Sequence, residues 1–205
     1  MNLALFLTAS WVLILTPGPD MIYVITRGVS QGRKAGMISA VGVTLGILVH
    51  TLFAAFGLAI ILRTSSLAFL AVKIAGALYL IYLGIKTIKQ KSDISFNKKK
   101  TLDGTGKVFF QGVLTNLLNP KIALFFLAFL PQFVIPDKGH ESVQMLCLGL
   151  TYALFCIIFL VFVGYFSGRI GSWLSRKGRL EGKIRCLSGS VFIVLGLRLI
   201  FMKGR

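Results

Sequence analysis

The chain has 205 residues, of which 56% are hydrophobic and only 14% are charged, and its formal net charge is +17. A soluble domain normally carries about 25% charged residues, so this composition excludes an ordinary soluble fold and predicts an all-α integral membrane protein. Residues 37–62 and 143–168 contain no Lys, Arg, Asp or Glu, and each segment exceeds the ~20 residues that cross a bilayer core. The basic residues flank apolar segments, as they do in cytoplasmic loops, so no nucleic-acid partner is expected.

Six apolar spans are predicted in chain order, and the first and the fourth contain proline near their middle. The spans are 3–26, 37–62, 67–88, 108–135, 143–168 and 186–202. The loops after the first, third and fifth spans are rich in Lys and Arg, whereas the other two loops hold one such residue each. The positive-inside rule then places the basic loops in the cytoplasm and both termini outside. Lys203 and Arg205 oppose this orientation. A model of five spans with the N-terminus inside is the alternative.

An internal repeat is predicted within a single transporter domain, residues 1–205. Residues 89–107 are polar and lysine-rich, which is typical of a flexible cytoplasmic linker. This linker separates two three-span halves, 1–88 and 108–205. When Pro19 is aligned with Pro120, Asp20 falls on Lys121. Because a repeat with an odd number of spans must be inverted in the membrane, the substrate site is expected at the interface of the halves near the midplane.

The prolines of "TPGP" and "NLLNPK" are predicted to break the first and fourth helices. Proline removes a backbone donor and clashes with the preceding turn. In hydrocarbon each unpaired backbone group costs several kcal/mol, so such a break is tolerated only against protein or water. Breaks at corresponding places in two halves indicate a transporter site. The alternative is that each proline only kinks its helix and has no role in transport. The expected substrate-binding residues are Thr16, Pro17, Gly18, Pro19, Asp20, Asn116, Asn119, Pro120 and Lys121.

Asp20 and Lys121 follow the two breaks directly, and ionisable residues inside a membrane are functional hypotheses by default. Three interpretations are open: a structural salt bridge, a grip on a zwitterion with Asp20 on the amine and Lys121 on the carboxylate, or snorkelling of Asp20 to the interface. His50 is the only histidine within a span. It is expected either to relay protons together with Asp20 or to pack as a neutral, hydrogen-bonded side chain.

No catalytic residue, cofactor site or metal site is predicted. The three cysteines form no CxxC pair, which argues against redox or metal-binding frameworks. The alternative function is transport of a cation or metal ion, although the spans offer only one carboxylate and one histidine as ligands.

Four motifs resemble the LysE/RhtB family of bacterial amino-acid exporters, and the fit is closer to the threonine/homoserine branch than to the lysine branch. The motifs are "TPGPDMIYVITRGVSQGRKAG", "GVTLGILVH", "GALYLIYLG" and "NLLNPKIALFFLAFLPQF". The resemblance runs over essentially the whole chain. It implies proton-coupled antiport of small neutral amino acids, such as threonine or homoserine, across the bacterial cytoplasmic (inner) membrane. It also implies a homo-oligomer, expected to be a dimer, with residues 17–20 and 119–121 as the family's Pro-Gly-Pro-Asp and Asn-Pro-Lys motifs.

Overall fold

The computed structural model describes residues 3–58, 66–89, 103–135, 140–170 and 178–201. These residues form helices and short connections, which confirms the all-α class. The elements are α1 (Leu3–Leu15), α2 (Pro19–Gln31), α3 (Arg33–Phe53) continued by the π-helix η1 (Ala54–Leu58), α5 (Ser66–Lys89), α6 (Thr105–Leu117), α7 (Pro120–Leu124) continued by the π-helix η2 (Phe125–Phe129) and the 3₁₀-helix η3 (Leu130–Phe133), α8 (Glu141–Tyr165) and α10 (Gly178–Phe201).

Two described helices are long and apolar enough to cross a membrane alone, Arg33–Gly57 and Glu141–Tyr165. Two pairs of helices satisfy the same criteria together: α1 with α2, bent by 44°, and α6 with Pro120–Phe133, bent by 47°. The described part of the chain therefore holds two to four candidate spans, as expected of an integral membrane protein. The third predicted span lies within α5, and the sixth overlaps the C-terminal part of α10; both are continuous helices of 24 residues, but neither is among the candidate spans of the described residues.

Several predicted boundaries are corrected by the structure. Helix α2 runs on to Gln31, and α10 begins at Gly178 rather than at residue 186, because polar and basic residues prolong a helix beyond its apolar run. Residues 90–102 of the predicted linker lie outside the described residues. The linker is nevertheless shorter than expected, since Lys89 still belongs to α5 and α6 already begins at Thr105.

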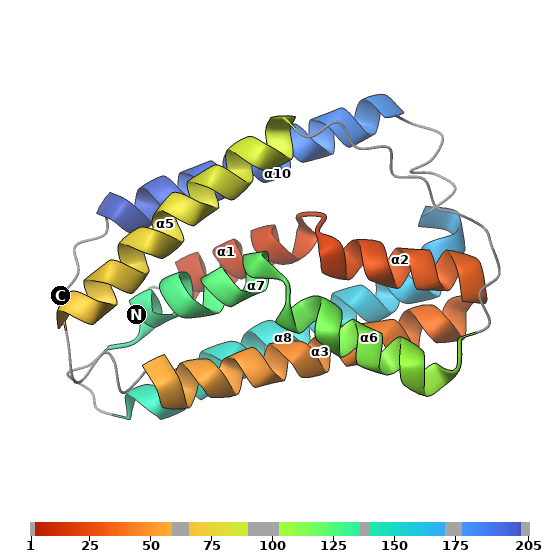
Figure 1. The fold of residues 1–205 in the computed structure, drawn as a ribbon, viewed down its shortest axis with the longest axis horizontal. Helices are drawn as coiled ribbons and strands as arrows, with labels where there is room; N and C mark the ends of the chain where they lie inside the picture. The colour runs from red at the N-terminus through yellow and green to blue at the C-terminus, as the bar shows by residue number, and fades with distance from the viewer. Residues whose placement is uncertain (1–2, 59–65, 90–102, 136–139, 171–177, 202–205) are drawn as a thin grey trace.

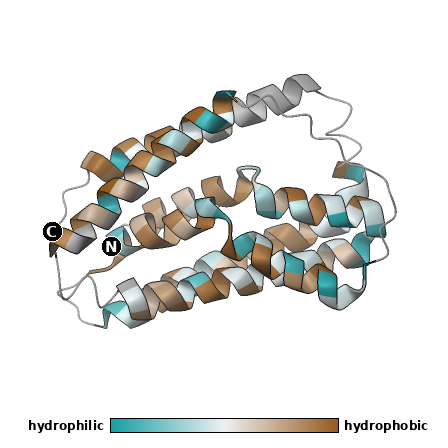
Figure 2. Cartoon of the chain, viewed as in Figure 1, coloured by the Kyte–Doolittle hydropathy of each residue, from teal (hydrophilic) through white to brown (hydrophobic). Residues whose placement is uncertain are grey.

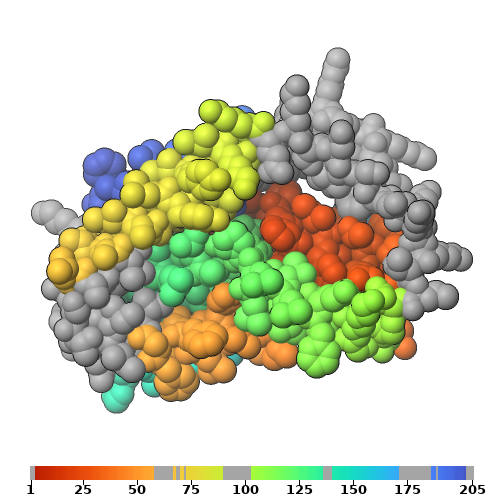
Figure 3. Space-filling model, viewed as in Figure 1, coloured from red at the N-terminus to blue at the C-terminus, as the bar shows by residue number. Residues whose placement is uncertain are grey.

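The helices form two layers with the broken helices between them. Helices α5 and α10 pack along each other on one side, and α3 packs on α6 and α8 on the other side. The α1–α2 pair and α7 run through the middle (Figure 1). The space that the ribbons leave between α5 and α7 is filled by side chains (Figure 3).

Hydrophobic residues dominate most of the helices, and hydrophilic ones gather where α2 ends and α6 begins (Figure 2). Large apolar side chains are exposed on outer faces, among them Phe53, Phe110 and Ile158. Exposure of this kind suits a bundle surrounded by lipid.

Small residues let the helices approach closely. A Cβ atom on Gly36 would lie 2.7 Å from the carbonyl oxygen of Gly164, and one on Gly42 would clash with the carbonyl of Phe109. Helices in membranes associate through such close backbone contacts, because lipid supplies no hydrophobic driving force. Helix α3 is thereby held against both α6 and α8, which fixes the elements around the two breaks.

Candidate substrate site at two helix breaks

The two breaks lie at mid-length of the bundle (Figure 1), and side chains of the second half form hydrogen bonds to the first half there. Pro19 and Pro120 each stand at the first position of a helix, where proline's missing N–H is not needed. Gly18 precedes α2 in an extended conformation and provides no side-chain cap. The first break therefore needs polar partners from elsewhere in the chain.

Lys121 supplies the partner for the end of α1. Its Nζ donates to the carbonyl oxygens of Leu13 and Thr16, at 3.1 Å and 2.9 Å. The last carbonyls of a helix lack partners within the helix and carry the negative end of its dipole, so an ammonium stabilises them. A Cβ on Gly18 would lie 3.0 Å from this Nζ, so glycine at this position gives the ammonium room to reach the break.

Asp20 lies in the first turn of α2, where the helix dipole favours a negative charge. Its Oδ2 accepts a hydrogen bond of 2.9 Å from Nδ2 of Asn116 in the other half. Asp20 and Lys121 are both buried by other parts of the protein, each at 6% exposure, and the depth of Asp20 in the membrane stays a prediction. The two charges form no direct ion pair with each other, although both belong to the described residues. The structure thus contains no Asp20–Lys121 salt bridge.

Three buried polar atoms at the breaks find no hydrogen-bond partner among the described residues. They are Oδ1 of Asp20, Oδ1 of Asn116 and Nδ2 of Asn119. The other amide atom of each asparagine is used, since Oδ1 of Asn119 caps α7 by accepting from the backbone N–H of Lys121 at 3.0 Å. Buried polar groups without partners are uncommon and call for a ligand or water. The breaks therefore offer two acceptors and one donor to a polar ligand.

Two other predicted site residues, Thr16 and His50, lie beside the two breaks. The hydroxyl of Thr16 donates to its own helix at Val12, so Thr16 contributes only its carbonyl oxygen to Lys121. Nε2 of His50 lies 3.3 Å from the carbonyl oxygen of Asn116, and its ring stacks on Phe126 at 5.9 Å. His50 is half-buried, and both of its interpretations stay open.

Two residues of α8 border the site and were missed by the sequence analysis. Tyr152 and Cys156 are buried one helical turn apart, and the charge of Asp20 contributes to the electrostatic environment of both side chains. The ring of Tyr152 also packs on Phe125, with centroids 4.9 Å apart. Their spacing of four residues places them on one helix face, but nothing in the sequence shows which face of this apolar helix meets the breaks.

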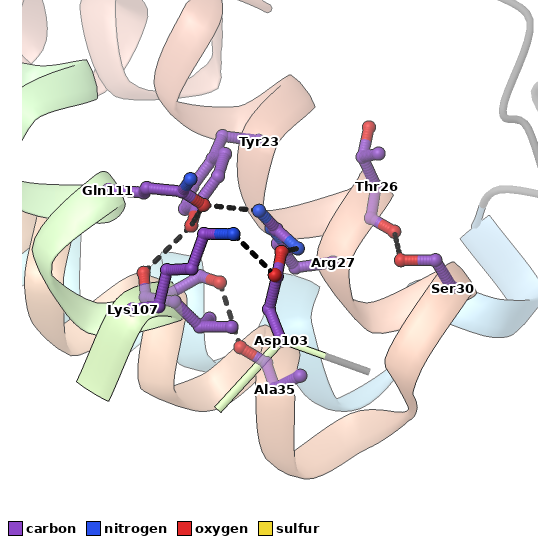
Figure 4. Close-up of polar contacts among 10 residues, drawn as sticks. Tyr23, Thr26, Arg27, Ser30, Ala35, Asp103, Lys107 and Gln111 are labelled. Atoms are coloured by element: carbon purple, nitrogen blue, oxygen red, sulfur yellow. Dashed lines mark hydrogen bonds and ion pairs between the residues drawn. The ribbon is translucent and has the colours of Figure 1, made fainter. Parts of the chain in front are cut away.

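A second polar cluster, also missed, joins α2 to the start of α6 (Figure 4). Nη1 of Arg27 and Nζ of Lys107 both bind Asp103, at 2.8 Å and 2.7 Å. Arg27 also donates to Gln111, and the hydroxyl of Tyr23 donates to the carbonyl of Val108 at 2.7 Å. Hydrogen bonds from Lys107 and Arg27 hold the pKa of Asp103 below its ordinary value. Asp103 lies in the segment assigned to the linker, which is why this pairing was not predicted.

Metal ligands do not converge within the described ranges, where no three His, Cys, Asp or Glu side chains come close enough to hold an ion.

Comparison with known proteins identifies the family. The model of the LysE type translocator family matches residues 11–203. The chain belongs to the LysE family. It is 29% identical over 191 residues to the homoserine/homoserine lactone efflux protein of Salmonella typhimurium, covering 93% of this chain and 92% of that protein. It is 31% identical over 191 residues to an uncharacterized membrane protein of Pseudomonas aeruginosa, covering 91% of this chain and 88% of that protein. No solved structure matches.

Membership of the LysE family establishes a membrane transporter with a small-molecule substrate and confirms the predicted resemblance. The family match includes both breaks, so the contacts of Asp20 and Lys121 lie within the region shared with the translocator family.

Proposed function

We propose that this protein exports small neutral amino acids, such as threonine or homoserine, from the cytoplasm, and that the substrate binds where the two breaks meet. The single observation that carries the proposal is the set of three buried, unpaired polar atoms beside Lys121. The relatives named as homoserine/homoserine lactone efflux proteins support the substrate class.

The chemistry of the breaks matches a zwitterion. Oδ1 of Asp20 and Oδ1 of Asn116 are acceptors, and an α-ammonium group has three donors to offer them. Nδ2 of Asn119 is a donor suited to a carboxylate. Lys121 uses two of its three donors on carbonyl oxygens, so one N–H is left for the same carboxylate. The residues at the breaks are buried in this conformation, which supports entry and exit of the substrate by alternating access.

Inverted three-helix repeats, with six spans in total, fit the contacts around the breaks. In the alignment that places Pro19 on Pro120, Asn116 corresponds to Leu15. The bond from Asn116 to Asp20 then has a counterpart in the bonds that Lys121 makes on either side of Leu15. Each half therefore reaches the charged residue of the other half from nearly corresponding positions, which supports a pseudo-two-fold axis in the membrane plane.

The α5–α10 pair supports the same symmetry. A Cβ on Gly84 would meet the carbonyl of Gly189, and a Cβ on Gly196 would meet the carbonyl of Ala77. In the alignment of Gly84 with Gly196, Ala77 falls on Gly189, so these two contacts also exchange with each other. Rocking of one half against the other about this axis is the proposed transport motion.

The proposal has three further parts. The protein exchanges protons through Asp20 and His50, it forms a homodimer, and it lies in the bacterial inner membrane. His50 contacts the backbone of Asn116, whose side chain binds Asp20. A proton bound by Asp20 or His50 would therefore change the charge or the hydrogen bonding beside the two acceptors proposed for the substrate's ammonium group.

Uptake of labelled amino acids into inside-out vesicles tests this function. Vesicles holding the parent protein should accumulate threonine or homoserine when a pH gradient is imposed, and Asp20→Asn should reduce the rate at least about tenfold, equivalent to about 1.4 kcal/mol. Glu141→Gln is the matched control, because it removes a buried carboxylate at the start of α8, far from the breaks. Equal uptake by Asp20→Asn and the parent would show that the substrate site lies elsewhere.

A further inference from the structure

The cluster around Arg27 joins the two halves of the molecule on the same helix face that carries Asp20. Asp20, Tyr23 and Arg27 stand three and seven residues apart in α2, and such spacings place side chains on one face of a helix. Arg27 lies roughly 10 Å along the axis from Asp20, at 1.5 Å per residue. Its partners are Gln111, from the second half of the chain, and Asp103, from the segment that leads into α6. A polar stripe therefore leads from the substrate site to this contact between the halves.

The cluster lies at the cytoplasmic end of the proposed arrangement. Helix α2 ends there and α6 begins there (Figure 4), next to loops that are rich in Lys and Arg, the mark of the cytoplasmic side. A surface pocket of about 320 Å³ opens at this end, with Lys34, Asp103 and Thr105 in its wall. Val108 lines the same pocket and accepts the hydrogen bond of Tyr23. The cluster thus stands between this pocket and the breaks.

We infer that Tyr23, Arg27, Asp103 and Gln111 form the cytoplasmic gate of the transport path, whose bonds between α2 and α6 part to admit the amino acid. The inference rests on the proposed function and adds the route by which substrate reaches the site.

The gate is built from bonds that break easily. The side chains of Arg27 and Asp103 are 13% and 21% exposed, and ion pairs open to water stabilise a contact only weakly. Lys107 holds Asp103 from its own segment, so Asp103 keeps one partner when the halves separate. Because the pKa of Asp103 lies below its ordinary value, the pair is charged at physiological pH. The gate then responds to substrate and to motion of the halves rather than to protonation of Asp103.

Labelling of Cys156 tests the gate without requiring transport. Cys156 is buried beside the site, whereas Cys147 and Cys186 are exposed, so Cys147→Ser and Cys186→Ser leave one reporter thiol. In inside-out vesicles, Arg27→Ala should speed labelling of Cys156 by a small, membrane-impermeant thiol reagent about two- to fivefold, the range expected for the loss of a partly exposed ion pair. Lys107→Ala is the matched control, since it removes a cation bound to the same carboxylate but does not join the halves. Labelling at the parent rate in Arg27→Ala, or equal acceleration by both variants, would overturn the gate.

Cross-linking provides the opposite perturbation. The variant carries Arg27→Cys and Asp103→Cys in a chain whose native cysteines are replaced by Ser. A short bifunctional thiol reagent with a reducible linker then joins the two new cysteines. Export should be lost on cross-linking and regained when the linker is reduced. Export that continues in the cross-linked protein contradicts the gate. If the parent protein exports no amino acid, the proposed function fails, while the labelling of Cys156 still decides whether this cluster controls access from the cytoplasm.

Discussion

The two helix breaks bend the chain by nearly the same angle, 44° and 47°, but they are stabilised differently. The second break is capped locally, because Oδ1 of Asn119 accepts from the backbone of Lys121 two residues later. The first break has no such cap, since Gly18 has no side chain. Its exposed carbonyls, on Leu13 and Thr16, are bound by the ammonium of Lys121 from the other half.

This difference shows that the first break depends on the second. A displacement of α7 would carry Lys121 away from the end of α1, and a displacement of α6 would release Asn116 from Asp20. If the two halves rock against each other, as proposed, these contacts would break or form as the halves move, so they would couple the two breaks to that motion. Variants that remove one contact at a time measure how strongly the two breaks are coupled.

Lys121→Met is expected to have the largest effect. It removes both hydrogen bonds to the end of α1, and bonds to charged groups contribute about 1.5–3 kcal/mol each, so the free energy of unfolding should fall by about 3 kcal/mol or more. Export should be lost as well. Thermal unfolding in detergent measures the first effect and vesicle uptake the second. Lys86→Met, which removes an exposed cation from α5, should change neither, and a Lys121→Met protein as stable as the parent would disprove the dependence of α1 on Lys121.

Asn116→Ala should follow in size. The change removes the hydrogen bond to Asp20 and leaves the buried carboxylate without it, at a cost of about 1–3 kcal/mol. Thr115→Ala serves as the control, because its hydroxyl bonds only within α6. The unfolding midpoints of the two variants are compared. An equal loss of stability in both would show that the bond from Asn116 to Asp20 does not couple the breaks.

Asn119→Ala tests the local cap of the second break. Loss of an N-cap side chain typically costs about 1 kcal/mol, and Asn119→Ser should retain most of that stability, because a serine oxygen can still accept from the Lys121 backbone without adding a charge near Asp20. Unfolding measurements on both variants check this. If the two variants are equally destabilised, the cap is not what stabilises the start of α7.

Gly18→Ala should have the smallest effect on stability. The extended backbone of Gly18 suits any residue, but the added Cβ would lie 3.0 Å from Nζ of Lys121, so the ammonium must shift by a few tenths of an ångström. We expect slower export with a change in unfolding free energy below about 1 kcal/mol. Gly106→Ala meets no atom within 4 Å and should leave export unchanged, and the same export rate in both variants would show that the fit around Lys121 is not critical.

Much of the site could be predicted from local chemistry. Proline and glycine act on their own neighbours, so both breaks were placed correctly at Pro19 and Pro120. The choice of Asp20 and Lys121 as the charges at the breaks also followed, because charges in apolar segments need partners. Their actual partners did not follow. Leu13 and Thr16 contribute only backbone carbonyls to Lys121, and any residue type can do this.

The gate cluster shows a second limit. Arg27 and Asp103 are 76 positions apart in the chain, and Asp103 stands in a segment whose composition indicates a linker. The sequence alone determined an all-helical membrane protein, the two breaks and the charges beside them, because these depend on apolar length and on the backbone chemistry of proline. Only the tertiary structure decided which groups bind those charges and which atoms stay free for a ligand, because the packing of glycine-lined helices sets which faces meet.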